Sequence, residues 1–147
     1  MMLRWKASFS ASCLHATTCL FEDMPCSNRE LTTAIQPASE ALAGALQACG
    51  LDAHKTLSLF TGLAADYDNN RQLVEITVAR LQGAGALSAA AISRLAGHIA
   101  DLEAAVLRIR PALADELAVR GRPLREQWEA RGPGFLRQVA LLTNDPF

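Results

Sequence analysis

Apolar residues recur at alternating intervals of three and four in the second half of the chain. The series consists of Ile92, Leu95, Ile99, Leu102, Val106, Ile109 and Leu113. This spacing places one apolar seam along an α-helix, which we expect from Ser88 to Arg110, where Pro111 interrupts it. The seam could pack inside an antiparallel bundle or form a parallel coiled-coil dimer. The early interruption and the few paired charges beside the seam favour the bundle.

Capping signals place the helices before this one. Ser27 with Glu30 forms a capping box, and the apolar stripe that follows continues to Gly50. Pro37 either kinks this helix or opens a second one. Asp52 predicts the cap of the next helix, whose inward side includes Phe60.

A turn at residues 66–70 begins a further helix with an apolar face between Leu73 and Leu81, closed by the glycines that follow. Beyond Pro111 the breakers predict three short helices. The first ends at Gly121, the second runs from Pro123 to the segment Gly-Pro-Gly at 132–134, and the third begins there.

These elements and the composition agree on the fold class. Alanine, the strongest helix former, occurs 27 times, whereas aromatic residues make up only 5% of the chain. A chain of 147 residues has the length of one domain. We therefore predict an all-α protein, a single helical bundle of about five to seven helices over residues 27–147, with a truncated C-terminal end as a further expectation.

The first 26 residues differ from the rest. They are rich in serine and threonine and hold three of the four cysteines, and no acidic residue precedes Glu22. No clean apolar region of a secretory signal is present. Alternation from Trp5 to Cys13 suggests a strand, but an isolated hairpin is marginal in water. We therefore expect a poorly ordered extension, or a true start at Met24 instead of Met1.

Charge and hydropathy narrow the function classes. The net charge is −1 and no run of about 18 apolar residues occurs, so the sequence predicts neither a membrane-spanning helix nor a basic field for nucleic acid. Helix-rich composition without a signal peptide favours a cytoplasmic protein with reduced thiols.

Catalytic and cofactor motifs are missing from the sequence. Cys13, His15, Cys19 and Cys26 lack the paired spacing of a zinc site, and no phosphate-binding loop, dinucleotide fingerprint or nucleophile elbow occurs. We expect no metal, no cofactor and no catalytic residues, although an enzyme fragment stays open as an alternative.

The densest unusual segment lies between residues 108 and 137, where seven arginines and four acidic residues leave a surplus of three positive charges. Arg122, Arg125 and Arg131 beside Trp128 could bind a phosphate or carboxylate. The competing interpretation is a solvated helix face with ion pairs between residues four apart.

The run Arg-Pro-Leu-Arg-Glu-Gln-Trp-Glu-Ala-Arg-Gly-Pro-Gly at residues 122–134 resembles a motif of a bacterial protein family of unassigned function. The resemblance covers about a tenth of the chain and implies no activity. Since the members of that family are longer, it implies that the chain is an N-terminal or truncated piece.

The C-terminal segment is apolar on almost all sides between Phe135 and Leu142, so one bundle face cannot cover it. We expect an incompletely buried interaction surface, which comprises Trp128, Leu136, Val139 and Leu142. Its partner would be another protein, a downstream domain or a second copy of the chain. The sequence thus predicts a non-enzymatic helical interaction module, or the N-terminal part of a larger bacterial protein. The alternative is an enzyme or ligand-binding fragment with an arginine-based anion site.

Overall fold

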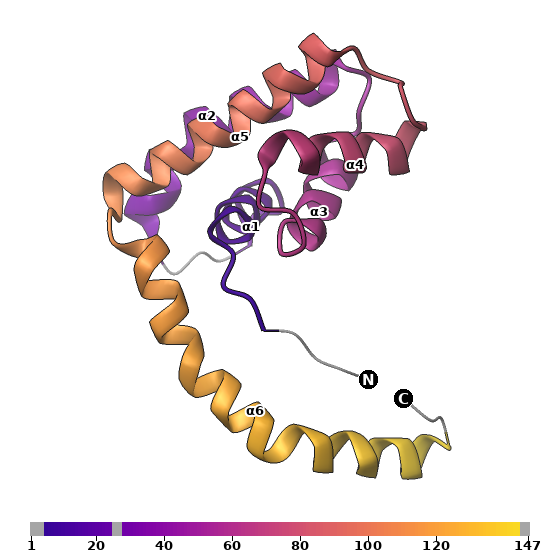
Figure 1. Ribbon diagram of the computed structural model, residues 1–147. Coiled ribbons are helices and arrows are strands. Elements are labelled where there is room, and N and C mark those ends of the chain that lie inside the picture. Colours follow the sequence, from indigo (N-terminus) through magenta and orange to yellow (C-terminus); the bar gives the residue numbers. More distant parts are fainter. Residues whose placement is uncertain (1–4, 25–27, 145–147) are drawn as a thin grey trace. The chain divides into compact units, whose positions relative to one another are not determined.

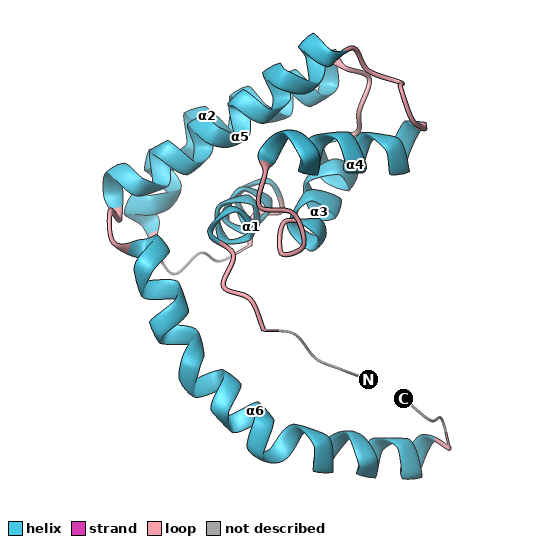
Figure 2. Cartoon of the chain, in the orientation of Figure 1, coloured by secondary structure: helices cyan, strands magenta, loops and turns pink. Residues whose placement is uncertain are grey.

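The computed structural model describes residues 5–24 and 28–144, and this part of the chain forms six helices and no strand (Figure 2). The helices are α1 (Phe9–Phe21), α2 (Arg29–Ala48), α3 (Ala53–Leu63), α4 (Asn70–Gln82), α5 (Ala89–Ile109) and α6 (Leu113–Thr143). The predicted all-α class is confirmed. The chain divides into two compact units, one of residues 8–113 and one of residues 1–7 with 114–147.

The first unit is a bundle of α1 to α5 around one hydrophobic core (Figure 1). Helix α2 packs along α5, α1 packs mainly on α3, and α4 packs on α5 and α3. The largest fully buried side chains are Phe60, Leu14, Ile35, Leu42, Leu46, Leu57, Leu73, Leu95, Ile99, Leu102, Val74 and Val106. All five helices contribute to the list, so each has an apolar face covered by its neighbours.

Side-chain caps begin each helix of the bundle. Asp52, Asn69 and Ser88 accept hydrogen bonds from the amides three residues later, as the sequence predicts. For α2 the cap is Asn28, which accepts from the amide of Leu31 at 3.1 Å. The Ser27 of the predicted capping box lies outside the described residues.

Left-handed glycines close two of these helices. Gly50, with a φ of +71°, follows the C-terminal end of α2, and Gly83, with a φ of +97°, ends α4. Both positions match the sequence prediction.

Residues 9–21 form the helix α1, whereas the sequence predicts a poorly ordered extension up to residue 26. Helix α1 buries Cys13, Leu14 and Thr17 in the core, so the predicted boundary at residue 27 falls inside the bundle. The apolar residues of this segment also fit a helical face, and the hydroxyl of Ser8 caps the helix by accepting from the amide of Ala11. The second half of the alternation that suggested a strand, residues 9–13, lies inside this helix.

The apolar seam of α5 packs against other helices of the same chain. Leu95, Ile99 and Leu102 are fully buried against the other helices of the bundle, which agrees with the bundle interpretation. Pro37 neither ends nor splits α2. It lies on an exposed side, where water can hydrate the carbonyl of Thr33 that loses its amide partner.

A polar cluster ties three helices of the bundle together. The carboxylate of Glu103 on α5 accepts hydrogen bonds from the hydroxyl of Ser10 on α1 and from the amide of Asn70 on α4. A second buried hydrogen bond joins the hydroxyls of Thr17 and Ser39 at 3.0 Å. Both contacts satisfy polar groups that burial would otherwise leave without partners.

The prediction of three short helices after Pro111 is wrong, since residues 113–143 form the single helix α6. Pro123 and Pro133 lie inside it, and each removes one backbone hydrogen bond. The carbonyls that lose their partners belong to Val119 and Glu129, both exposed, so water can bind them. Figure 1 shows α6 curving along its length, as internal prolines cause.

None of the described helices is both long and apolar enough to cross a membrane.

Candidate interaction site

Helix α6 carries one continuous apolar stripe. Its members follow one another at intervals of three or four and are Leu117, Gly121, Leu124, Trp128, Gly132, Phe135, Val139 and Leu142. Their mean spacing is close to the helical repeat, so they share one side of the helix. Leu124 and Phe135 are each 62% exposed and Leu142 is 85% exposed. Gly132 is the only described residue of α6 that is buried.

The centre of the stripe is hollowed into an open cleft of about 440 Å³. Its lining residues are Trp5, Leu124, Gln127, Trp128, Arg131, Gly132 and Phe135. The rings of Trp5 and Trp128 meet edge to face, with their centroids 6.4 Å apart and their planes at 61°. Such a pair adds about 0.5–1.5 kcal/mol beyond its buried area, so the two rings support one wall of the cleft.

Gly132 makes room for the indole of Trp128. A Cβ atom at position 132 would lie 2.6 Å from Cε2 and 2.9 Å from Nε1 of the ring, which is closer than non-bonded atoms approach. The indole therefore lies directly over the backbone of Gly132. This glycine sets the orientation of the largest side chain in the cleft.

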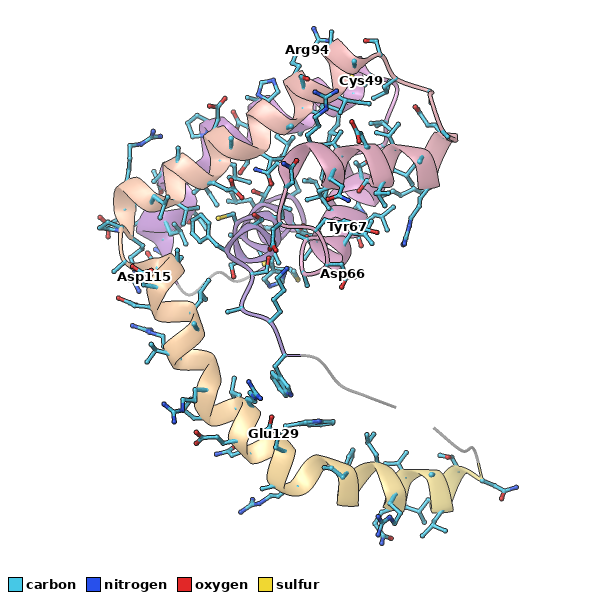
Figure 3. All side chains as sticks on the ribbon, viewed as in Figure 1. Cys49, Asp66, Tyr67, Arg94, Asp115 and Glu129 are labelled. Atoms are coloured by element: carbon cyan, nitrogen blue, oxygen red, sulfur yellow. The ribbon has the colours of Figure 1, made fainter. Side chains whose placement is uncertain are left out.

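Ion pairs between residues four apart flank the stripe. Arg125 and Glu129 are 2.6 Å apart, and Arg122 and Glu126 are 3.0 Å apart. Hydrogen bonding to Glu129, and then its charge, raises the pKa of the Arg125 guanidinium. Glu129, labelled in Figure 3, marks the middle of α6.

The structure does not bring the three arginines of the predicted anion site together. Arg131 lines the cleft, whereas Arg122 and Arg125 are engaged with Glu126 and Glu129. Nine residues separate Arg122 from Arg131, which puts them on opposite sides of an α-helix. One small anion on α6 would therefore meet at most two of the three guanidinium groups.

The residues of the predicted interaction surface all lie on α6. Trp128 is half-buried in the cleft, Val139 is a half-buried member of the stripe, and Leu142 is exposed. Leu136 is half-buried at the edge of the stripe, next to Phe135.

Sequence reasoning missed Trp5, Leu124, Gly132 and Phe135 as parts of one site. Leu124 and Phe135 were assigned to separate short helices, so their common side was not visible. The signal that could have revealed it is the spacing of apolar residues continued through the breakers at 121–123 and 132–134. Nothing in the sequence pattern links Trp5 to Trp128.

The bundle offers little catalytic chemistry. Cys13 is buried, and burial, followed by the charge of Glu103, raises the pKa of its thiol to about 12. His15 Nε2 lies 3.6 Å from Cys19 Sγ on exposed turns of α1, and Cys26 is outside the described residues. Across residues 5–24 and 28–144, no group of three or more potential ligands is arranged to hold a metal ion.

Comparison of the chain with protein-family models, curated proteins and solved structures gives no match.

Proposed function

We propose that this protein is a helical interaction module that binds another protein helix through the apolar stripe of α6. One observation carries the proposal: a helix of 31 residues presents a continuous apolar side with an aromatic cleft at its centre, and Leu124, Phe135 and Leu142 on this side are mostly exposed. Exposed apolar surface with a polar rim marks an association site.

The chemistry of the cleft suits a protein ligand. Trp128 and Phe135 supply large, rigid apolar contacts, while Gln127 and Arg131 supply polar groups at the same opening. Aromatic residues and arginine are enriched among the residues that dominate binding energy in protein interfaces. An amphipathic helix with apolar residues at intervals of three and four fits such a surface.

The alternative of an arginine-based anion site has weaker support. Arg122 and Arg125 already have carboxylate partners, and the charge they would offer to an anion is largely compensated. The exposed apolar stripe is therefore the better basis for a function.

A helical probe peptide tests the proposal. The probe is an uncharged amphipathic peptide with leucine at the first and fourth positions of each heptad, and the signal is the tryptophan emission of the protein. Binding should shift the emission to shorter wavelength, because the peptide excludes water from Trp128. Phe135→Glu should abolish the shift by placing a charge in the stripe.

The matched control is Val119→Glu. Val119 is 71% exposed and lies on the side of α6 away from the stripe. Val119→Glu should leave the titration of the protein with the helical probe peptide unchanged. Equal binding by the two variants, or no binding by the unmodified protein at a dilution at which light scattering shows a monomer, would contradict an association site on this stripe.

A further inference from the structure

The spacing of the α6 stripe is the same when read from either end. From Trp128, the next three positions lie four, seven and eleven residues away in both directions. Toward the N-terminus they are Leu124, Gly121 and Leu117, and toward the C-terminus they are Gly132, Phe135 and Val139. An antiparallel copy of the helix therefore presents its stripe at matching heights, with a two-fold axis at Trp128.

Side-chain sizes are complementary under this symmetry. Gly121 comes opposite Phe135 of the second copy, and Leu117 comes opposite Val139. Leu124 comes opposite Gly132, over which the indole of Trp128 lies. The incoming leucine thus enters the cleft beside that indole. A large residue therefore faces an open glycine at one of the three heights, where Phe135 meets Gly121, while at Gly132 the indole of Trp128 already fills the space.

The charges beside the stripe also match. A two-fold axis perpendicular to both helices sets the side of α6 that carries Arg125 and Glu129 next to the same side of the second copy. Arg125 lies three residues before Trp128 and Glu129 one residue after it, so Arg125 comes within about 3 Å in height of Glu129 of the other copy. The two Glu129 residues come equally close in height to one another, so two arginines flank two glutamates along this side of the interface.

We propose that the partner of the α6 stripe is the α6 stripe of a second copy of this chain, antiparallel to the first about an axis at Trp128. The inference rests on the proposed function, because it names the partner for the same surface. Both orientations set Trp128 against Trp128, but a parallel pair fits less well, since it would also set Gly121 against Gly121 and Phe135 against Phe135. It would leave holes at the glycines and crowd the aromatic rings.

Disulfide trapping distinguishes the two orientations. Leu117→Cys and Val139→Cys are prepared in the full chain, alone and mixed, and oxidised. The joined residues are identified by peptide mapping, which separates them from bonds made by the native cysteines. Because a disulfide needs Cα atoms within about 7 Å, only the mixture should give a bond between positions 117 and 139. Neither variant should form this bond, or a bond to itself, when oxidised alone.

The matched control is a mixture of Val119→Cys and Leu141→Cys. Both residues are 71% exposed and lie off the stripe. This mixture should form no bond between the two positions. Light scattering of the unmodified protein should show a dimer that dissociates on dilution, and Phe135→Glu should shift it to monomer.

Three results would overturn the inference. They are a self-linked bond at 117 or 139, which indicates a parallel pair, a dimer without the 117–139 bond, and a monomer at every concentration. A monomer that still binds the helical probe peptide would leave the proposed function standing, with a different partner. A monomer that binds neither would remove both.

Discussion

The bundle and α6 both carry helices with regularly spaced apolar residues, but these residues are buried in the bundle and largely exposed in α6. In the bundle, the seam of α5 is covered by α2 and α4, and Ile99 and Leu102 are inaccessible to water. In α6, the members of the stripe also follow one another at intervals of three or four, but Leu124 and Phe135 stay mostly exposed. A regular apolar stripe therefore predicts a helix and a contact, but it does not say whether the contact lies within the chain.

The α6 stripe differs from the α5 seam in its content of glycine and in the prolines near it. The covered seam of α5 holds only branched apolar residues, whereas glycine occupies positions 121 and 132 of the α6 stripe and prolines stand beside both. Glycine and proline weaken a helix, so α6 gains less from its own backbone than α5 does. The stability of α6 therefore depends more than that of α5 on side-chain contacts.

The largest expected difference between the two regions is in the free energy of unfolding, when one phenylalanine in each is replaced by alanine. Phe60 is fully buried in the bundle, and Phe60→Ala should lower the free energy of unfolding by about 3–5 kcal/mol, because it leaves a cavity. Phe135→Ala in the exposed stripe should change it by about 0.5 kcal/mol or less. Urea denaturation of the monomer followed by circular dichroism measures both. Similar losses for the two variants would show that the α6 stripe is covered in the folded chain.

The buried thiol of Cys13 should make the stability of the bundle depend on pH, an effect for which the exposed stripe of α6 has no counterpart among its apolar residues. The Cys13 thiol has a pKa of about 12 in the fold, raised from an ordinary value of 9.0 by burial and then by Glu103. The unfolded chain loses this proton first. The contribution to stability is therefore complete below about pH 9 and falls by about 1.4 kcal/mol per pH unit as the pH rises toward 12.

Unfolding free energies measured between pH 8 and pH 11 check this expectation. Cys13→Ala should remove that part of the alkaline loss, whereas Cys49→Ala, at the half-buried C-cap of α2, should retain it. Identical pH profiles for the two variants would show that Cys13 does not ionise on unfolding.

The sequence predicted the bundle well where caps and seams agree. Asp52, Asn69 and Ser88 begin their helices as expected, because a side-chain acceptor at the N-cap acts locally. Helix α1 was missed because its serines and threonines are poor helix formers, and its formation depends on burial of Leu14 against other helices. Such tertiary burial is not visible in a local pattern.

The site on α6 was only partly predictable. The sequence predicts a surface of Trp128, Leu136, Val139 and Leu142, but it also predicts a helix start at Pro123 and a helix end at residues 132–134, where α6 in fact continues. A proline costs one hydrogen bond and some strain, and an exposed helix can tolerate this when water binds the freed carbonyl. The ion pairs of Arg122 and Arg125 follow from spacing alone.

The smallest expected effect on stability comes from a substitution at Gly132, where the indole of Trp128 lies over the backbone. Gly132→Ala puts a Cβ atom 2.6 Å from the indole, so the ring must move off the backbone and the cleft must change shape. Gly134→Ala, two residues on, meets nothing within 4 Å and is the matched control. Each substitution removes a glycine from a helix, which by itself stabilises the helix by up to about 1 kcal/mol.

Gly134→Ala should therefore raise the helix content slightly and leave the tryptophan emission unchanged. Gly132→Ala should shift that emission and weaken binding of the helical probe peptide, with little change in the unfolding of the bundle. If both variants give the same emission and the same binding, the indole does not depend on Gly132 for its position.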